Sequence, residues 1–422
     1  MTISILTIIK IYIIVYLSFE WAIDQQMLQH SDFLILQVVP LLLFMFLTYK
    51  KRGAINIKPI SITVLFPMIV ILSSLVNEID FISLLLNVRW LLFPFFIYLI
   101  IINLNLNDKE LKNIVVFVFW IGIIHIPIAF LKYFVLQMHG EDTLGLIQHS
   151  GSSYVVAIGF AFILSFFRFN SKTVNILLIV GFIFIAIASG KRALVFILPL
   201  VFIVSIYLNV KDAKEALTQL IIMLVFIPIF IYVLVRLFPT LNPDREVGGK
   251  FDLDYVIEYA FEYESIERLS EYGETTSRVG TTMYLVEVAV DSPISVFLGL
   301  GGNQFSKING ADGIFPGVEY GVNGLTWIST QFGLVSAFIW FYYFYKFKNI
   351  AIEIIKRSKD NFWVSYAKSI YIVALIMSFF QFLYSPEYKN TIFISIVYLL
   401  LGVTYVYNKN IYKSKGLGYD TD

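Results

Sequence analysis

The 422-residue sequence has no cysteine and few charged residues. Without cysteine, disulfide bonds and thiolate metal sites are excluded. Charged residues make up 14% of the chain, against about 25% in a typical soluble domain. The net charge is +1, which offers no basic surface for nucleic acid, and the four histidines lack the paired spacing of a metal site. We therefore expect no nucleic-acid partner, no metal and no cofactor.

Apolar residues fill most of the sequence instead. They make up 58% of the chain, and the mean hydropathy is +0.79. A chain of this composition has too little polar surface to stay dissolved, so it is expected to be an integral membrane protein. The N-terminal apolar run has no small-residue cleavage site after it, so we interpret it as a first span rather than a cleaved signal.

The apolar runs are long enough to cross a membrane repeatedly. A spanning helix needs about 17–25 residues. The sequence predicts one transmembrane domain over 1–422, an all-α polytopic fold with about twelve spans: 3–19, 32–48, 60–76, 88–104, 113–136, 153–169, 173–189, 193–209, 219–238, 324–345, 366–384 and 391–407. A further apolar stretch, 281–301, is interrupted by glycines and is expected to be interfacial or re-entrant.

Lysine and arginine are distributed unevenly between alternate loops. The loops at 20–31, 77–87 and 137–152 contain neither residue. The loops that alternate with them, the 346–368 loop and the C-terminal tail contain many. Because cytoplasmic loops carry the excess of lysine and arginine, we expect both termini to be cytoplasmic.

Some cations nevertheless fall on the expected outer side. The stretch "ASGKRAL" places Lys191 and Arg192 in a short outer turn, and Arg89 and Arg278 lie at outer ends of spans. Contact with lipid headgroups would explain a single such arginine. It explains three less well, because the other outer loops avoid positive charge.

One large hydrophilic segment, 239–323, is expected outside the membrane. It opens with the helix-breaking run "FPTLNPDREVGGK" and continues as an amphipathic helix over 250–274, with eight acidic and two basic residues. The acidic charge favours a lid standing above the headgroups. The tyrosines of this helix could stack on sugar rings or simply pack on the protein. Its "DLD" tripeptide is too common in acidic helices to indicate a metal site.

Two segments suit a phosphorylated lipid. Arg192 stands at the outer mouth of a helix, and "TSRVGTTMYLVEVAVDSPISVFLGLGGNQF" combines Arg278 with an apolar helix, Pro293 and a glycine cluster. The planar guanidinium group binds phosphate oxygens two at a time. Glycine lets a backbone approach a bulky ligand closely. Together they fit a lipid pyrophosphate at the outer leaflet.

These residues resemble the O-antigen polymerase and ligase superfamily. "SGKRAL" is similar to the family's Ser-Arg turn at Arg192. The 276–305 segment is similar to its Arg, helix, Pro, Gly-x-Gly pattern. "VNGLTWISTQFGLVSAF" resembles the segment in which His-Asn precedes a glycine, matching at Asn323 and Gly333. The family's histidine is Val322 here, which puts ligase activity in particular doubt.

The resemblance implies a glycosyltransferase-C-like fold and a metal-independent polysaccharide polymerase in the bacterial inner membrane. Its substrates would be repeat units on undecaprenyl pyrophosphate, for O-antigen (lipopolysaccharide) or capsule. Membrane lipid and a chain-length regulator would be its other partners. The catalytic candidates are Arg192, Arg278 and Glu319, the last ranked first as a base over Glu287, Asp291 and Asp312. The substrate-binding candidates are Arg89, Lys191, Gly299, Gly301, Asn303 and Asn323.

Two other functions stay open. One is an O-antigen ligase that moves finished glycan to another acceptor. The other is a transporter or flippase for lipid-linked oligosaccharides. Transporters usually place charges near the bilayer midplane and show repeated halves. Here the notable cations lie at the outer ends of spans and the halves differ.

Overall fold

The computed structural model is mainly helical in the part of the chain that it describes, with two short antiparallel strands, β1 (Lys307–Ile308) and β2 (Ala311–Asp312). At some positions only the backbone is described. The described residues are 4–24, 34–51, 55, 61–79, 93–138, 140–143, 145–146, 151–165, 171–189, 192–210, 214–215, 217–218, 221, 228–229, 232–233, 235–236, 241–244, 246, 248–256, 286–287, 290, 292–302, 307–308, 311–312, 323–380 and 390–414.

The helices follow the apolar runs closely. They are α1 (Ile5–Asp24), α2 (Leu34–Lys50), α3 (Ser61–Val76), Phe93–Asn103, α5 (Asp108–Phe130), α6 (Gly151–Ser165), α7 (Lys172–Ser189), α8 (Arg192–Tyr207), α12 (Pro293–Leu298), α13 (Gly324–Arg357), α14 (Asn361–Leu375) and α16 (Thr391–Ser414). Two π-helical turns extend them, η3 (Leu131–Val135) after α5 and η7 (Ile376–Phe380) after α14, and a short 3-10 helix, η4, covers Gly140–Thr143.

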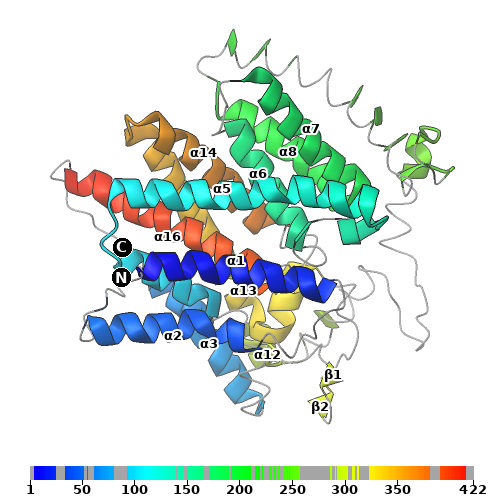
Figure 1. The fold of residues 1–422 in the computed structure, drawn as a ribbon. Coiled ribbons are helices and arrows are strands. Elements are labelled where there is room, and N and C mark those ends of the chain that lie inside the picture. The colour runs from blue at the N-terminus through cyan, green and yellow to red at the C-terminus, as the bar shows by residue number, and fades with distance from the viewer. Residues whose placement is uncertain are drawn as a thin grey trace.

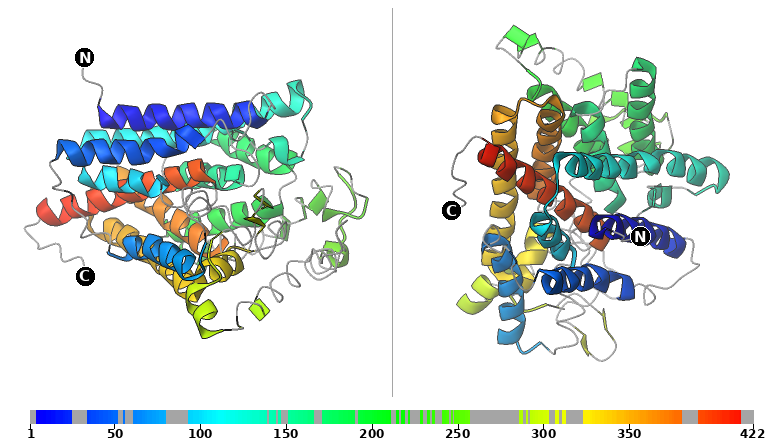
Figure 2. Two further views of the ribbon diagram at one scale, coloured as in Figure 1. Left: turned by 90° about the horizontal axis from the view of Figure 1, so that it is seen from below. Right: turned by 60° about the vertical axis from the view of Figure 1, so that its left-hand side comes forward.

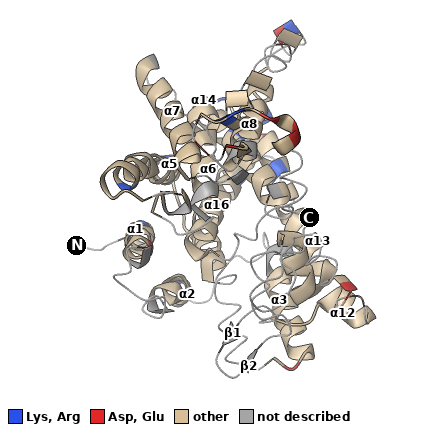
Figure 3. Ribbon diagram, turned by 90° about the vertical axis from the view of Figure 1, so that its right-hand side faces the viewer, with Lys and Arg blue, Asp and Glu red and all other residues tan. Residues whose placement is uncertain are grey.

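Many of these helices suit a bilayer. Within the described residues, five are long and apolar enough to cross a membrane, and six shorter apolar helices accompany them. Charged residues are rare along the described helices (Figure 3). The expected span at 219–238 lies mostly outside the described residues. A membrane protein is therefore supported, while twelve spans stay a prediction.

The long helices lie side by side as a bundle (Figures 1 and 2). Small residues allow the closest approaches: a Cβ on Gly122 of α5 would lie 2.9 Å from the Cα of Gly159 in α6, and one on Gly159 would lie 2.8 Å from the ring of Phe182 in α7. Close contact between backbones at small residues is the packing expected for helices in lipid, where no hydrophobic effect drives them together.

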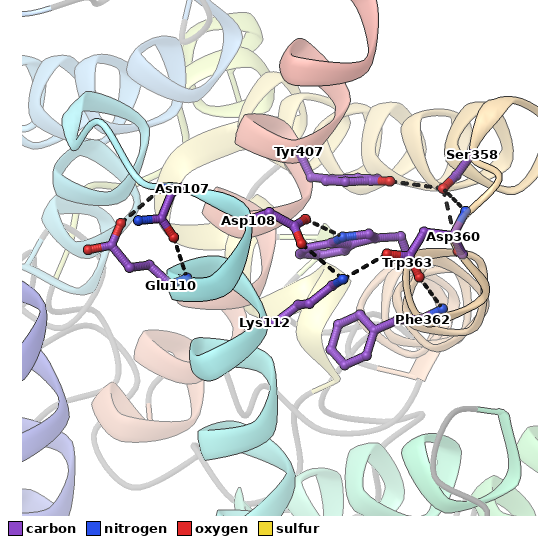
Figure 4. A network of polar contacts seen from close by, with 9 residues as sticks. All are labelled: Asn107, Asp108, Glu110, Lys112, Ser358, Asp360, Phe362, Trp363 and Tyr407. Carbon is purple, nitrogen blue, oxygen red and sulfur yellow. Dashed lines mark hydrogen bonds and ion pairs between the residues drawn. The ribbon is translucent and has the colours of Figure 1, made fainter. Parts of the chain in front are cut away.

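One end of the bundle carries a polar network (Figure 4). Lys112 of α5 lies 2.9 Å from Asp108 and 2.7 Å from Asp360, which precedes α14. The indole of Trp363 donates to Asp108 at 2.7 Å and stacks on Tyr407 of α16. Helices far apart in the sequence thus meet through charges. We call this the polar end.

Other contacts fix which helix termini share the polar end. Lys10 near the start of α1 donates to the carbonyl of Asn113 at 3.4 Å. Lys51, after α2, donates to the carbonyl of Asn103. Lys368 in α14 donates to Asn209 just after α8, at 2.7 Å. The described loops that the sequence predicted to be cytoplasmic therefore meet at one end, as a single membrane orientation requires.

The predicted loop at 346–368 is wrong. The helix α13 continues to Arg357 and α14 begins at Asn361, so only three residues connect them. The extension forms because Ala351 and Ile354 are fully buried and because Glu353 accepts hydrogen bonds from the side chains of α16. The cations in this segment therefore sit mainly on helices.

The turn expected at the start of the outer segment is present. Asn242 donates to the carbonyl of Glu246 at 2.9 Å, and Asp244 accepts from the backbone of Lys250 at 2.6 Å. Arg236 donates to the carbonyls of Gly248 and Gly249 at 2.8 and 3.0 Å. Of the expected amphipathic helix, residues 253–256 are helical and 257–274 lie outside the described residues.

Candidate functional site

The structure describes the substrate-binding candidates Gly299, Gly301 and Asn323 and the backbone of Arg192, together with two of the alternative base candidates, Glu287 and Asp312. The remaining candidates lie outside the described residues: Arg89, Lys191, Arg278, Asp291, Asn303 and Glu319. For Asp312, only the backbone in β2 is described, and Glu287 is exposed.

The helix α13 is broken at Gly333. This residue has φ 79° and ψ 166°, far from helical values, whereas the flanking residues 324–332 and 334–357 are helical. In a continuous helix each carbonyl accepts from the N–H four residues later. The break therefore releases the carbonyls of Thr330, Gln331 and Phe332. Released carbonyls are costly in a membrane unless they find other donors.

All three carbonyls do find donors. Leu300 donates its backbone N–H to Thr330 at 2.8 Å, and Gly301 donates to Gln331 at 2.9 Å. The carbonyl of Phe332 accepts from the hydroxyl of Ser336 at 2.6 Å. Residues 299–302, which we call the strap, thus supply two backbone donors to the broken turn of α13.

Glycines let the two backbones touch. Gly299 has φ 72°, and a Cβ there would overlap the backbone of Gln331. On α13, a Cβ on Gly333 would overlap the carbonyl of Phe297. On the other side of the strap, a Cβ on Gly301 would lie 2.7 Å from Ile79. The close approach that Gly299 and Gly301 permit is therefore to the protein's own chain, and substrate contact at these glycines stays a prediction.

The C-terminal end of α3 completes this crossing. Ser73 donates to the carbonyl of Gln331 at 2.9 Å, and Asn77 donates to the carbonyl of Gly299 at 3.1 Å. The hydroxyl of Ser74 accepts from the backbone of Gly302 at 3.3 Å. Sequence reasoning missed these residues. The signal was the run "SSLVN", three polar residues at the end of an otherwise apolar helix.

Asn323 begins α13. Its side-chain oxygen accepts from the backbone of Thr326 at 2.8 Å, which is the geometry of a helix N-cap. The match between this asparagine and the family segment thus has a local structural reason. Contact between Asn323 and a substrate stays a prediction.

Arg192 begins α8, and α8 ends beside Lys368 at the polar end. Its first residue therefore lies toward the other end of the bundle, as does the start of α13. The helix α8 packs against α6 and α14, whereas the strap packs against α3 and α13. The helix directions thus put Arg192 and the strap toward the same end, on different helices.

No side-chain cluster marks a metal centre in the described part of the chain: groups of three or more His, Asp or Glu are absent there. Asp252 of the "DLD" tripeptide accepts from the backbone of Tyr255 at 3.0 Å and so starts a helical turn. No family model matches the chain, and no curated protein matches it. The relation to the O-antigen polymerases stays a resemblance.

Proposed function

We propose that the protein joins undecaprenyl-pyrophosphate-linked oligosaccharide repeat units at the outer face of the bacterial inner membrane. The observation that carries the proposal is the crossing of the strap with α13. It brings together two of the three segments on which the resemblance rests, 276–305 and 322–338. The apolar helices and the uneven loop charges support a multi-pass protein with cytoplasmic termini.

The proposed reaction is a glycosyl transfer. A hydroxyl of the acceptor unit attacks the anomeric carbon of the donor chain, and the bond from that carbon to the pyrophosphate oxygen breaks. The hydroxyl proton passes to a carboxylate, with Glu319 the first candidate. Arg192 and Arg278 stabilise the charge on the departing undecaprenyl pyrophosphate. The leaving group is already activated, so the proposed reaction requires no metal.

A transporter or flippase of lipid-linked oligosaccharides is the second candidate. The break at Gly333 favours it, because transporters often build their substrate sites from discontinuous helices. The two functions differ in their product. A polymerase makes longer glycan chains, whereas a transporter moves unchanged units across the bilayer.

The test mixes the purified protein with the lipid-linked repeat units that accumulate in bacterial cells from which the protein has been removed. The buffer contains a chelator, because the proposed reaction requires no metal. We expect a ladder of lipid-linked polymer. Arg192→Ala should abolish the ladder, Arg192→Lys should reduce it severely because the planar fork is lost, and Lys191→Ala should retain part of it. Arg357→Ala, at the polar end, is the matched control and should polymerise normally.

Two results would contradict the proposal. If Arg192→Ala inserts correctly and still gives an undiminished ladder, Arg192 does not take part in the reaction and only contacts lipid headgroups. Wild-type protein that yields no ladder, but moves the same units across proteoliposomes, would establish the transporter instead.

A further inference from the structure

The strap has a glycine-rich sequence, "GLGG", that is typical of phosphate-binding loops. Such loops bind phosphate through free backbone N–H groups. In the strap, each of these groups already has a partner within the protein. Gly299 donates to Ser295 at 2.8 Å, Leu300 and Gly301 donate to α13, and Gly302 donates to Ser74. The strap backbone therefore has no donor left for a pyrophosphate.

The strap instead bonds to two neighbouring helices. It follows α12 directly and donates to the broken turn of α13, and the side chains of Ser74 and Asn77 at the end of α3 bond to it. Ser73 of the same helix bonds to the broken turn itself. The donors Ser73 and Asn77 come from the same helical turn of α3. Asn77 also donates to the carbonyl of Ser73 at 2.7 Å, so its amide joins the strap to α3.

We propose that Ser73 and Asn77 are positioning residues for polysaccharide chain extension, and that the strap is a fixed wall of the site rather than a phosphate-binding loop or a gate. This inference rests on the proposed function. Asn77 fixes the strap to the end of α3, and Ser73 fixes the broken turn of α13 to the same helix. Together they set the position of α12 relative to α13, the elements that carry the ends of the two resembling segments. Pyrophosphate binding then falls to cationic side chains.

The first measurement is the polymerisation rate of Asn77→Ala. Losing a hydrogen bond that orients a site should lower kcat by about tenfold and leave KM for the lipid-linked unit nearly unchanged. Ser73→Ala, which keeps both hydrogen bonds of Asn77, should give a smaller loss in kcat. It also serves as the second variant should Asn77→Ala fail to insert.

The second measurement replaces the lost hydrogen bond between α3 and the strap by a disulfide bond. The chain has no cysteine, so Ser74→Cys with Gly302→Cys would supply the only possible disulfide. The 3.3 Å contact between Ser74 Oγ and Gly302 N brings these positions within disulfide reach. Oxidation of this pair in the Asn77→Ala background should restore most of the rate, and reduction should remove the gain. Because any disulfide can stabilise a fold, a second pair placed elsewhere is needed to separate positioning of the strap from general stabilisation.

The control pair is Ser165→Cys with Ser205→Cys, whose hydroxyls lie 3.2 Å apart between α6 and α8. Its disulfide should not restore Asn77→Ala. A full rate for Asn77→Ala would overturn the proposal. So would an oxidised Ser74–Gly302 pair that stops an otherwise wild-type enzyme until it is reduced, because the strap would then have to move. Wild-type protein that makes no polymer would refute the proposed function, while disulfide formation would still report the contact of the strap with α3.

Discussion

Two features of the structure require glycine at position 333. Its φ of 79° lies in the region that favours glycine, and the space where a Cβ would stand is filled by the carbonyl of Phe297. Gly248 has a similar φ of 89°, but nothing lies within 4 Å of its Cβ position. Comparing substitutions at these two glycines therefore distinguishes the cost of backbone strain from the cost of steric overlap.

We predict that Gly333→Ala destabilises the folded protein by more than about 3 kcal/mol, because strain and overlap add. Gly248→Ala should cost only about 1–2 kcal/mol, from the backbone alone. Thermal unfolding of both variants in detergent measures the difference. Equal shifts in the transition temperature would mean that the chains do not cross as closely at Gly333 as the structure shows.

At this scale the sequence predicted which residues are special better than it predicted their neighbours. Gly299 and Gly301 were recognised as sites of close approach, and the groups that approach them in the structure are the backbone of α13 and residues at the end of α3. Contact between these glycines and a substrate stays a prediction. Asn323 was matched as a substrate residue and is also an N-cap. The spacing of glycine and asparagine in a sequence can indicate that a particular backbone conformation is required. Which group requires it becomes visible only when helices distant in the sequence are packed together.

The helices themselves were largely predictable. An apolar run of fixed length is a direct requirement of the bilayer, so α3, α7 and α8 begin and end within two residues of the expected limits. The break in α13 was not predictable from hydropathy, because a glycine in a membrane helix is usually tolerated without a break. Its cause is the strap, which comes from a segment more than twenty residues earlier and supplies the replacement donors.

The connection between α13 and α14 depends on one ion pair with a distinct pH dependence. Burial opposes ionisation of Asp360, but the hydrogen bonds from Lys112 and from the backbone of Phe362 outweigh it and lower the pKa of this carboxyl group. A lowered pKa means that the stabilisation is complete above the unfolded value of about 3.9 and is lost as the pH falls through the folded value.

We therefore predict that Asp360→Asn, which keeps the cap on α14 and removes the charge, lowers stability at pH 7, and that its difference from wild type shrinks as the pH falls below the unfolded value of about 3.9. Because both side chains are partly exposed, the coupling in a double-mutant cycle with Lys112→Met should be about 0.5 kcal/mol. Unfolding in detergent at several pH values measures both. A difference between wild type and Asp360→Asn that grows toward acid pH would contradict this account.

For the whole molecule, the direction of each helix can be compared with the charge of its loops. The starts of α1, α5 and α14 and the ends of α2, α8, α13 and α16 share the polar end through contacts between distant residues. The sequence assigned the same set of loops to the cytoplasm from lysine and arginine alone. The two arguments are independent, because one uses composition and the other uses packing.

Lys359, in the connection between α13 and α14, and Asp254, in the segment expected outside the membrane, are both exposed in the structure, and the chain contains no cysteine of its own to react. A membrane-impermeant maleimide applied to intact cells should therefore label Asp254→Cys and leave Lys359→Cys unlabelled until the inner membrane is opened. Labelling of both only after opening would move the large segment to the cytoplasm. The reverse pattern would invert the protein in the membrane, and in either case the strap and Arg192 would lie on the side where lipid-linked units are made rather than polymerised.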